Sequence, residues 1–386
     1  MEYYDKIHVE QTEEAQKFMN ELQQYHQQIQ KVSKDISPND KQNFWELFSS
    51  NDSFENKFST LSQLDPFTLG YKAVYELAQT WYKESKSSEI SPKIKSALAR
   101  EKLTDYYGIF GTGGDVISDS GEKINTINIS TIAALLAASV KNEDKETYCP
   151  ILKVGSMAVT SVIGSANLFK HIFGVRSHEH VVKDIIDTGF SFLSPGDIGI
   201  DYNHNLKLAR KAVFESGITD VIKIVGPTAC LMDPKGQVTG VSSTEMLPFV
   251  LYNYNESIES DRLDRAIVIY SETGVDELVN GTYLFDMSKE QINLTYFHPS
   301  QFGLEPIKLD KLKEKASIEE QAQYTSKILS NDDSIDTEVI NVLCLNAATI
   351  LCLKTNISNL HAEYLKLKHL FDADKTINNL KISEAT

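Results

Sequence analysis

The spacing of hydrophobic residues divides the chain into two parts. From residue 1 to about residue 103, apolar side chains recur three or four positions apart, as in Phe18, Leu22 and Tyr25, and Gly70 is the only glycine. This spacing predicts amphipathic helices. The polar stretch 31–59, with a turn signal at Pro38, predicts a loosely packed connection. We therefore expect residues 1–103 to form an all-helical unit.

After residue 104 the pattern changes, and short apolar runs alternate with helix-like runs. The apolar runs are YGIF, ILKVG, VIKIVGP and RAIVIY, and STIAALLAASV is typical of the helical ones. This alternation predicts an α/β unit with a mainly parallel sheet. The polar stretches 116–123 and 141–147 are expected to be surface loops. Residues 177–217 return to helical spacing. The predicted fold class is α/β, in which a small all-helical domain (1–103 joined by about 177–217) lies beside a larger α/β domain (104–176 and 218–386).

Composition narrows the possible partners. The chain has 54 acidic and 38 basic residues, for a net charge of -16, and nucleic acid is therefore not an expected partner. It has no apolar run of about 18 residues and no signal-peptide pattern, so we expect a cytoplasmic protein without a membrane partner. The four cysteines form no C-x-x-C pair and are expected to fill apolar space, and the nine histidines form no H-x-x-x-H pattern.

A glycine cluster follows the first apolar run of the predicted α/β unit. It reads GTGGD and extends from Gly111 through Gly114 to Asp115. Without Cβ atoms, the backbone N–H groups of such a cluster can approach an anion closely, and phosphate is the natural ligand. A tight turn is the alternative for this pentapeptide. The dinucleotide and ATP glycine motifs do not fit, because neither G-x-G-x-x-G nor G-K-[ST] is present.

Two further sequence elements are candidates for binding an anion. Asn128 or Ser130 in NIST can cap the helix that follows, whose N-terminus would then present free N–H groups and a positive dipole end. Ordinary capping is the alternative. Lys153 follows a predicted strand and precedes small hydroxyl residues, so it can neutralise a phosphate, although a solvated lysine would look the same. The hydroxyl residues are Ser156, Thr160, Ser161 and Ser165.

Two adjacent carboxylates, Asp276 and Glu277, come just after the RAIVIY run. Hard carboxylate oxygens at the end of a strand suit Mg2+, which usually takes one or two protein carboxylates together with substrate phosphates and waters. The alternative is a solvated acidic pair, which is common in a chain this acidic.

In order, GTGGD, TINIST, TSVIGSANLF, I-x-x-V-G-P, GVDEL and HPSQFGLE resemble the anthranilate phosphoribosyltransferase family, from about Gly108 to Glu305. The resemblance implies a homodimeric, Mg2+-dependent glycosyltransferase of tryptophan biosynthesis. It would move the ribosyl phosphate of phosphoribosyl pyrophosphate to anthranilate, with release of pyrophosphate. It implies that Lys153 is catalytic, that Ser130, Asp276 and Glu277 bind metal, and that the donor contacts are Gly111, Gly114, Asp115, Thr126, Asn128, Ile129, Ser130, Thr131, Lys153, Ser161 and Ser165.

The departures from the family pattern concern the acceptor. Thr219 replaces the arginine that would face the carboxylate of anthranilate, and we expect it to contact the acceptor only weakly. Lys223 and Arg210 are the candidates for a compensating cation. The residues after Lys153 also differ, since a histidine, an asparagine or glycine and a second basic residue are replaced by Val154, Ser156 and Met157.

These departures leave three functions open. The first is an active anthranilate phosphoribosyltransferase of a divergent lineage. The second is a family member that uses another acceptor, or that binds ligands without turnover. The third is a helical scaffold or interaction protein in which the α/β unit is only structural.

Overall fold

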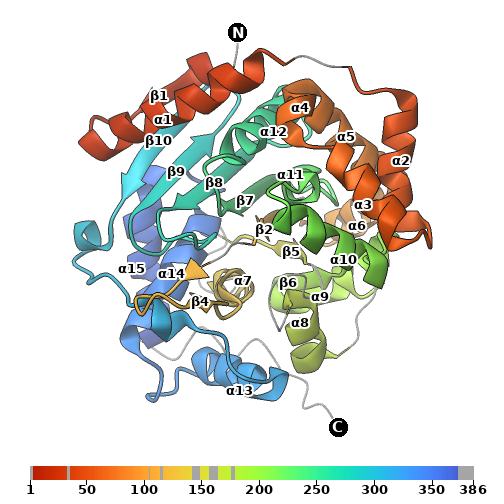
Figure 1. The fold of residues 1–386 in the computed structure, drawn as a ribbon. Helices are drawn as coiled ribbons and strands as arrows, with labels where there is room; N and C mark the ends of the chain where they lie inside the picture. The colour runs from red at the N-terminus through yellow and green to blue at the C-terminus, as the bar shows by residue number, and fades with distance from the viewer. Residues whose placement is uncertain are drawn as a thin grey trace.

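A twisted eight-stranded sheet crosses the molecule, with helices on both of its faces (Figure 1). The computed structural model describes residues 3–32, 35–103, 105–113, 116–140, 148–155, 164–174 and 179–372. The strand order is β1-β10-β9-β8-β7-β2-β5-β6, and only β9 is antiparallel to its neighbours. The strands are β1 (Ile7–Val9), β2 (Tyr107–Gly111), β5 (Ile151–Val154), β6 (Phe190–Leu193), β7 (Gly236–Val241), β8 (Arg265–Ser271), β9 (Thr282–Met287) and β10 (Ile292–Phe297).

The sheet separates two hydrophobic cores, since the side chains of a strand point alternately to opposite faces. In one core α7 lies against α14 and α14 packs on α15, and a separate small cluster joins α13 to α8 on the same side. The helices on this side are α7 (Ile129–Ser139), α8 (Ser165–Phe173), α13 (Ile318–Leu329), α14 (Thr337–Leu351) and α15 (Leu360–Asp372). Every described residue of α7 except Ser130 is buried, in agreement with its uniformly apolar sequence.

The second core joins the N-terminal helices to the other face of the sheet. There α5 packs against α11 and α12, and α3 packs along α10. Residues 177–217 thus contribute α10 to the helical part of the molecule, in line with the helical spacing of their sequence. The helices are α1 (Glu13–Gln30), α2 (Pro38–Ser49), α3 (Phe54–Gln63), α4 (Pro66–Leu69), α5 (Tyr71–Glu84), α6 (Ser87–Arg100), α9 (Val181–Thr188), α10 (His204–Glu215), α11 (Val221–Thr228) and α12 (Leu247–Glu259).

Several segments differ from the sequence-based expectation. VIKIVGP is the helix α11 rather than a strand, because the Asp220 side chain accepts a hydrogen bond from the Ile222 N–H and caps a helix there. The predicted loose connection around Pro38 is instead two helices, α2 and α3. Pro38 occupies the first turn of α2 after a capping box at Ser37. Within 177–217, Phe190–Leu193 is the edge strand β6.

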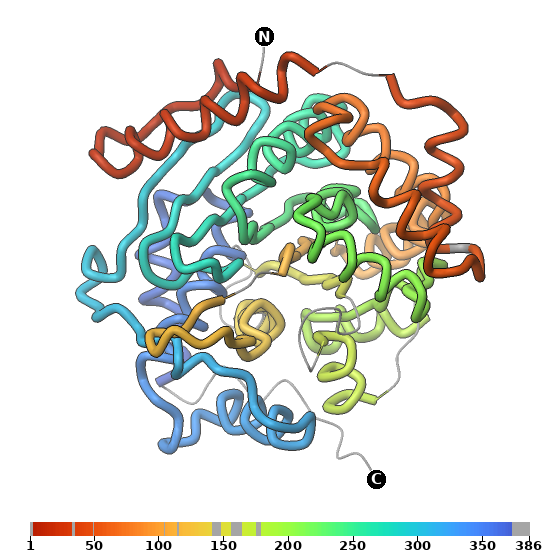
Figure 2. Tube along the Cα trace, in the orientation of Figure 1, coloured from red at the N-terminus to blue at the C-terminus, as the bar shows by residue number. Residues whose placement is uncertain are grey.

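The N-terminal segment is not purely helical. A 3-10 turn (Tyr3–Lys6) leads into β1, which pairs in parallel with β10 and so covers that edge of the sheet. Figure 2 shows the chain then running back along the sheet as α1. Phe18 of α1 stacks on Tyr283 of β9 with ring centroids 3.8 Å apart, which fastens the helix to the sheet.

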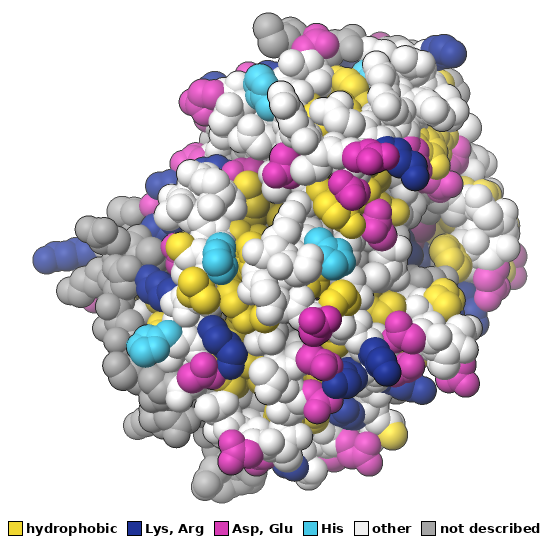
Figure 3. Space-filling view, turned by 90° about the vertical axis from the view of Figure 1, so that its left-hand side faces the viewer, with side chains coloured by type: hydrophobic (Ala, Val, Ile, Leu, Met, Phe, Trp, Pro, Cys, Tyr) yellow, Lys and Arg dark blue, Asp and Glu magenta, His cyan; other side chains and the backbone are white. Residues whose placement is uncertain are grey.

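The predictions for the surface loops and the cysteines can be compared with the structure. Residues 116–123, predicted to be a surface loop, begin the ribbon of β3 (Val116–Ile117) and β4 (Lys123–Ile124), whereas the predicted loop 141–147 lies outside the described residues. All four cysteines are buried and form no disulfide, as predicted. On the face in Figure 3, acidic and basic side chains are interspersed. No helix within the described ranges is long and apolar enough to cross a membrane.

Candidate active site

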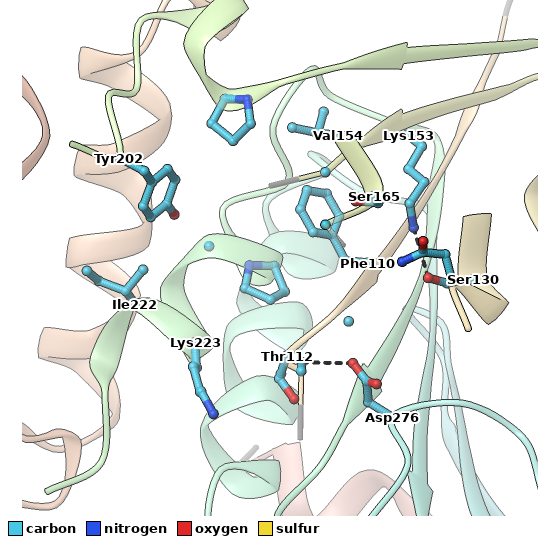
Figure 4. Close-up of a pocket in the computed structure, with 18 of the residues that line it drawn as sticks. Phe110, Thr112, Ser130, Lys153, Val154, Ser165, Tyr202, Ile222, Lys223 and Asp276 are labelled. Atoms are coloured by element: carbon cyan, nitrogen blue, oxygen red, sulfur yellow. Dashed lines mark hydrogen bonds between the residues drawn. The ribbon is translucent and has the colours of Figure 1, made fainter. Parts of the chain in front are cut away.

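A cavity of about 240 Å³ lies at the carboxyl ends of the parallel strands. This is where open α/β sheets bind ligands, because the loops that follow the strands converge there. Figure 4 shows two ends of the cavity. Ser130, Lys153 and Asp276 lie at one end, and Tyr202 and Ile222 lie at the other.

The glycine cluster lies directly against the carboxylate segment. The Gly113 N–H donates a hydrogen bond to Asp276 Oδ2 at 2.8 Å. A Cβ at Gly111 would lie 2.1 Å from the same Oδ2, and a Cβ at Gly240 would lie 1.5 Å from the Asp276 carbonyl oxygen. Glycine is therefore required at both positions for this approach. Thr112 helps to hold the loop, because its hydroxyl accepts a hydrogen bond from the Ser242 N–H at 3.0 Å.

The N-terminus of α7 forms a second wall of this end. Asn128 occupies the N-cap position of α7 and forms no side-chain capping bond. The Ile129 and Thr131 N–H groups donate to the Ile127 and Asn128 carbonyls, so it is the positive end of the helix dipole, rather than a set of free N–H groups, that faces this part of the cavity. Thr126, Asn128 and Ser130 all line the cavity. The segment before the helix is fixed from outside by the bridge between Thr126 and Lys313.

Lys153 supplies a buried positive charge. Lys153 is only 3% exposed, and its ammonium donates a hydrogen bond to Ser130 Oγ at 3.0 Å. Burial lowers the pKa of Lys153 to about 8, and the carboxylates of Glu277 and Asp276 oppose that shift. An ammonium held out of water in this way interacts strongly with an anion that enters the cavity.

Glu277 is buried beside Asp276. Burial raises the pKa of the Glu277 carboxyl well above its usual range, and the neighbouring Asp276 adds to the effect. Oε2 of Glu277 is buried and, among the described residues, has no hydrogen-bond partner. Such an orphaned oxygen fits a cation as its partner. The described ranges contain no cluster of three or more His, Cys, Asp or Glu that could hold a metal ion by itself, so an Mg2+ ion at Asp276 and Glu277 would need further oxygens from a substrate or from water.

The opposite end of the cavity is aromatic and apolar. Tyr202 and Ile222 lie there (Figure 4), and Trp81 adds aromatic surface, since its ring centroid lies 6.4 Å from that of Tyr202. The apolar lining of the cavity as a whole also includes Pro195, Ile200 and Leu231. Arg210 and Lys223 also line the cavity. Arg210 donates from Nε to Asp220 Oδ2 at 2.7 Å, and both side chains are almost fully buried. This end suits a planar molecule with a polar group at its rim.

Comparison with known proteins assigns this architecture to a family. The family described as "Glycosyl transferase family, a/b domain" matches residues 106–376. The anthranilate phosphoribosyltransferase of Methanococcus aeolicus is 30% identical over 277 residues, which are 70% of this chain and 76% of that protein. The chain belongs to the anthranilate phosphoribosyltransferase family. The enzyme of the same name from Saccharolobus solfataricus is 24% identical over 266 residues, 67% of this chain and 70% of that protein.

Solved structures of the family share this fold. Anthranilate phosphoribosyltransferase from Thermus thermophilus superposes with a TM-score of 0.63 at 19% identity, covering 91% of this chain and 95% of that one. The Saccharomyces cerevisiae enzyme in complex with PRPP and Mg superposes with a TM-score of 0.63 at 20% identity, and the match covers 93% of this chain and 96% of that one. The predicted fold class, a mainly parallel α/β sheet with a helical part beside it, is thus confirmed.

The structure brings most of the predicted site residues of this family member to one cavity. Gly111, Thr126, Asn128, Ser130, Lys153, Ser165, Asp276 and Glu277 line it. Ile129 and Thr131 are buried in α7 and are not among the lining residues, and neither is Thr219, which precedes α11 half-buried. Gly114, Asp115, Ser156, Met157 and Ser161 lie outside the described residues.

Other lining residues were not predicted from the sequence. Trp81 and Tyr202 come from segments about 120 residues apart, and their own motifs carry no signal for ligand binding. Thr112, by contrast, lies within the GTGGD motif, so its hydroxyl could have been recognised from the sequence as a residue of the site.

Proposed function

We propose that the protein transfers the ribosyl phosphate of phosphoribosyl pyrophosphate to an aromatic amine of the anthranilate type and releases pyrophosphate. The observation that supports this most strongly is the shared cavity. One end offers Lys153, the carboxylates of Asp276 and Glu277, and a helix N-terminus, and the other end offers aromatic walls. A pyrophosphate donor and a planar acceptor fit these two ends.

The donor end contains the groups that a departing pyrophosphate requires. The Lys153 ammonium and the first turn of α7 offset negative charge on the leaving oxygens, in a site where burial makes each interaction stronger than in water. Asp276, Glu277 and the Ser130 hydroxyl would hold Mg2+, which when bound neutralises developing charge on the pyrophosphate.

The reaction needs no protein nucleophile. The amine nitrogen of the acceptor donates its electron pair to C1 of the ribose. The bond between C1 and the pyrophosphate oxygen breaks, and its electron pair leaves with the pyrophosphate. The nitrogen then loses a proton to solvent. The protein contributes by holding donor and acceptor in one cavity and by stabilising the leaving group at Lys153.

Pyrophosphate release by the purified protein tests this function. With phosphoribosyl pyrophosphate and Mg2+, we expect release only when anthranilate is added, and we expect chelation of Mg2+ to abolish it. Donor plus Mg2+ should also raise the melting temperature, and Lys153→Ala should reduce that shift. Donor stabilisation without release for any amine would indicate a ligand-binding protein, and the absence of both would favour the scaffold function.

The biological setting completes the proposal. We place the protein in the cytoplasm, in tryptophan biosynthesis, as a homodimer. In each chain the helices of residues 1–103 and about 177–217 would form a helical domain beside an α/β domain whose sheet also takes in β1 and β6. Light scattering on the purified protein should give twice the chain mass of 43.3 kDa. A monomer at working concentration would contradict the homodimer and leave the proposed reaction untouched.

A further inference from the structure

The two acids of the donor end lie in a connection between strands. β8 ends at Ser271 and β9 begins at Thr282, so residues 276–278 lie outside the strands that pair in the sheet. Leu278 is fully buried in this connection. A buried peptide N–H or C=O outside the sheet needs another partner, because leaving it unpaired costs free energy. The partner of Leu278 therefore helps to decide how the segment of the two acids runs.

That partner is the side chain of Asn346 on α14. Its Oδ1 accepts a hydrogen bond from the Leu278 N–H at 2.8 Å, and its Nδ2 donates to the Leu278 carbonyl oxygen at 2.7 Å. Nδ2 also donates to the Val342 carbonyl oxygen at 2.9 Å, which fixes the amide on its own helix. Two carbonyls and one N–H as partners admit only this orientation of the amide. Asn346 is almost fully buried and clamps both backbone groups of Leu278.

This clamp bears directly on Glu277. The Leu278 N–H belongs to the peptide that joins Leu278 to Glu277, so its bond to Asn346 restricts the direction in which the Glu277 side chain leaves the backbone. On the other side, Asp276 Oδ2 accepts a hydrogen bond from the Gly113 N–H at 2.8 Å (Figure 4). Glu277 therefore lies between two fixed points, and its side chain lines the cavity.

On the basis of the proposed function, we propose that Asn346 is a positioning residue of the donor end, which aims the Glu277 carboxylate at the Mg2+ that accompanies the pyrophosphate group. Asn346 does not line the cavity, so it acts through Leu278 and not by contact with a substrate. The helix α14 that carries it also packs on α7, which begins beside Ser130 (Figure 1). The groups proposed to hold the metal thus rest on one pair of helices. A buried amide that only completes the fold would leave metal affinity unchanged, and this difference separates the two roles.

The test removes the amide and follows the Mg2+ concentration that gives half-maximal pyrophosphate release. Asn346→Leu nearly keeps the size of the side chain and leaves both backbone groups of Leu278 without their partner. Loss of a residue that orients a metal ligand commonly costs about 10- to 100-fold in metal affinity, so the half-saturating Mg2+ concentration should rise by at least about 10-fold. Release at saturating Mg2+ should recover, because both acids are still present. The KM for the acceptor should stay within about twofold, since the aromatic end is untouched.

Thr349→Val is the matched control. Thr349 lies about one turn further along α14, is fully buried, and donates from its hydroxyl to the Leu345 carbonyl oxygen at 2.9 Å. This change also removes a buried hydrogen bond from α14 but does not touch Leu278. It can lower the melting temperature, whereas the Mg2+ dependence should stay that of wild type. Equal Mg2+ dependence in Asn346→Leu and Thr349→Val would overturn the inference.

A second variant covers the case in which Asn346→Leu does not fold. Asn346→Ala leaves space in which water can bond the two Leu278 groups, so the fold is kept and only the fixed direction is lost. The same rise in half-saturating Mg2+ is expected. An unchanged Mg2+ dependence in folded Asn346→Ala would overturn the inference, and so would failure of both variants to fold, because Asn346 would then serve folding alone.

Failure of the proposed function is separable from failure of this inference. If no amine supports pyrophosphate release by the wild-type protein, transfer is refuted, and calorimetric binding of pyrophosphate with and without Mg2+ still tests Asn346. A smaller gain in affinity from Mg2+ in Asn346→Leu than in Thr349→Val would uphold its role. Equal gains in the two variants, or no gain in wild type, would overturn it.

Discussion

Gly240→Ala should damage the site without removing any functional side chain. A Cβ on Gly240 would lie 1.5 Å from the carbonyl oxygen of Asp276 and 2.5 Å from its carbonyl carbon. Carbon and oxygen atoms in contact need about 3.5 Å, so the segment of Asp276 and Glu277 has to retreat by about 2 Å. Gly240 lies in β7, an interior strand of the sheet, and is paired with Gly111 on one side and Ile269 on the other, so the strand itself cannot yield.

The size of the effect follows from that displacement. Overpacking of this kind costs about 1–3 kcal/mol of stability, which leaves a chain of this size folded. A misplacement of about 1 Å can cost about 100-fold in rate, and here the displaced groups are the proposed metal ligands. We therefore expect at least about a 100-fold loss in kcat/KM for pyrophosphate release, with a decrease of a few degrees in melting temperature.

The assay pairs steady-state pyrophosphate release with thermal unfolding. Gly196→Ala is the matched control, because a Cβ there would meet only Ser194 Oγ, at an ordinary 3.7 Å. Its melting temperature should match that of wild type. If Gly240→Ala kept activity within tenfold of wild type and melted at the same temperature, the carboxylate segment would not be held where the structure places it, and the steric reasoning would be refuted.

Three further predictions concern charge and burial. Asp276→Asn combined with Glu277→Gln should abolish Mg2+-dependent turnover while the melting temperature of the metal-free protein stays within a few degrees of wild type. Persistence of turnover would show that these two acids do not take part in the reaction. Because burial lowers the pKa of Lys153 to about 8, the ammonium is lost as pH rises from 7 to 9. Calorimetric binding of metal-free pyrophosphate should weaken over that range, and Lys153→Met should bind weakly at every pH. An unchanged pH profile in that variant would contradict this assignment. Burial also raises the pKa of Cys230 to about 11 and that of Cys344 to about 12, so a thiol reagent at pH 8 should label these cysteines only after denaturation, and labelling of the native protein would contradict their burial.

Elements with a local signature could be predicted from the sequence. The helical spacing of Phe18 and Leu22 marks α1, because positions four apart share one face of a helix whatever surrounds it. The same holds for the glycine cluster at Gly111, since only glycine allows so close an approach of a carboxylate or an anion. Asp276 and Glu277 come a few residues after the β8 run, so the order of residues alone places them near the carboxyl end of a strand.

The sequences of short apolar runs did not show whether each run forms a helix or a strand. VIKIVGP and FSFL are both brief and apolar, yet the first is the helix α11 and the second is the strand β6. Periodicity cannot separate the two cases at this length, and the outcome depends on the cap at Asp220 and on the pairing of β6 with β5. β1 is likewise a strand only because β10, far along the chain, offers it an edge.

The two ends of the cavity differ in the same way: one is built from local sequence motifs, and the other from residues that are distant in the sequence. The sequence by itself determined the proposed donor end, because its candidate anion-binding elements are contiguous motifs whose chemistry is set by backbone freedom and local charge. Only the tertiary structure decided the proposed acceptor end, where Trp81 and Tyr202 come together from separate segments. It also decided that Arg210 is paired with Asp220, since this contact depends on how α10 packs beside the start of α11, which no local pattern encodes.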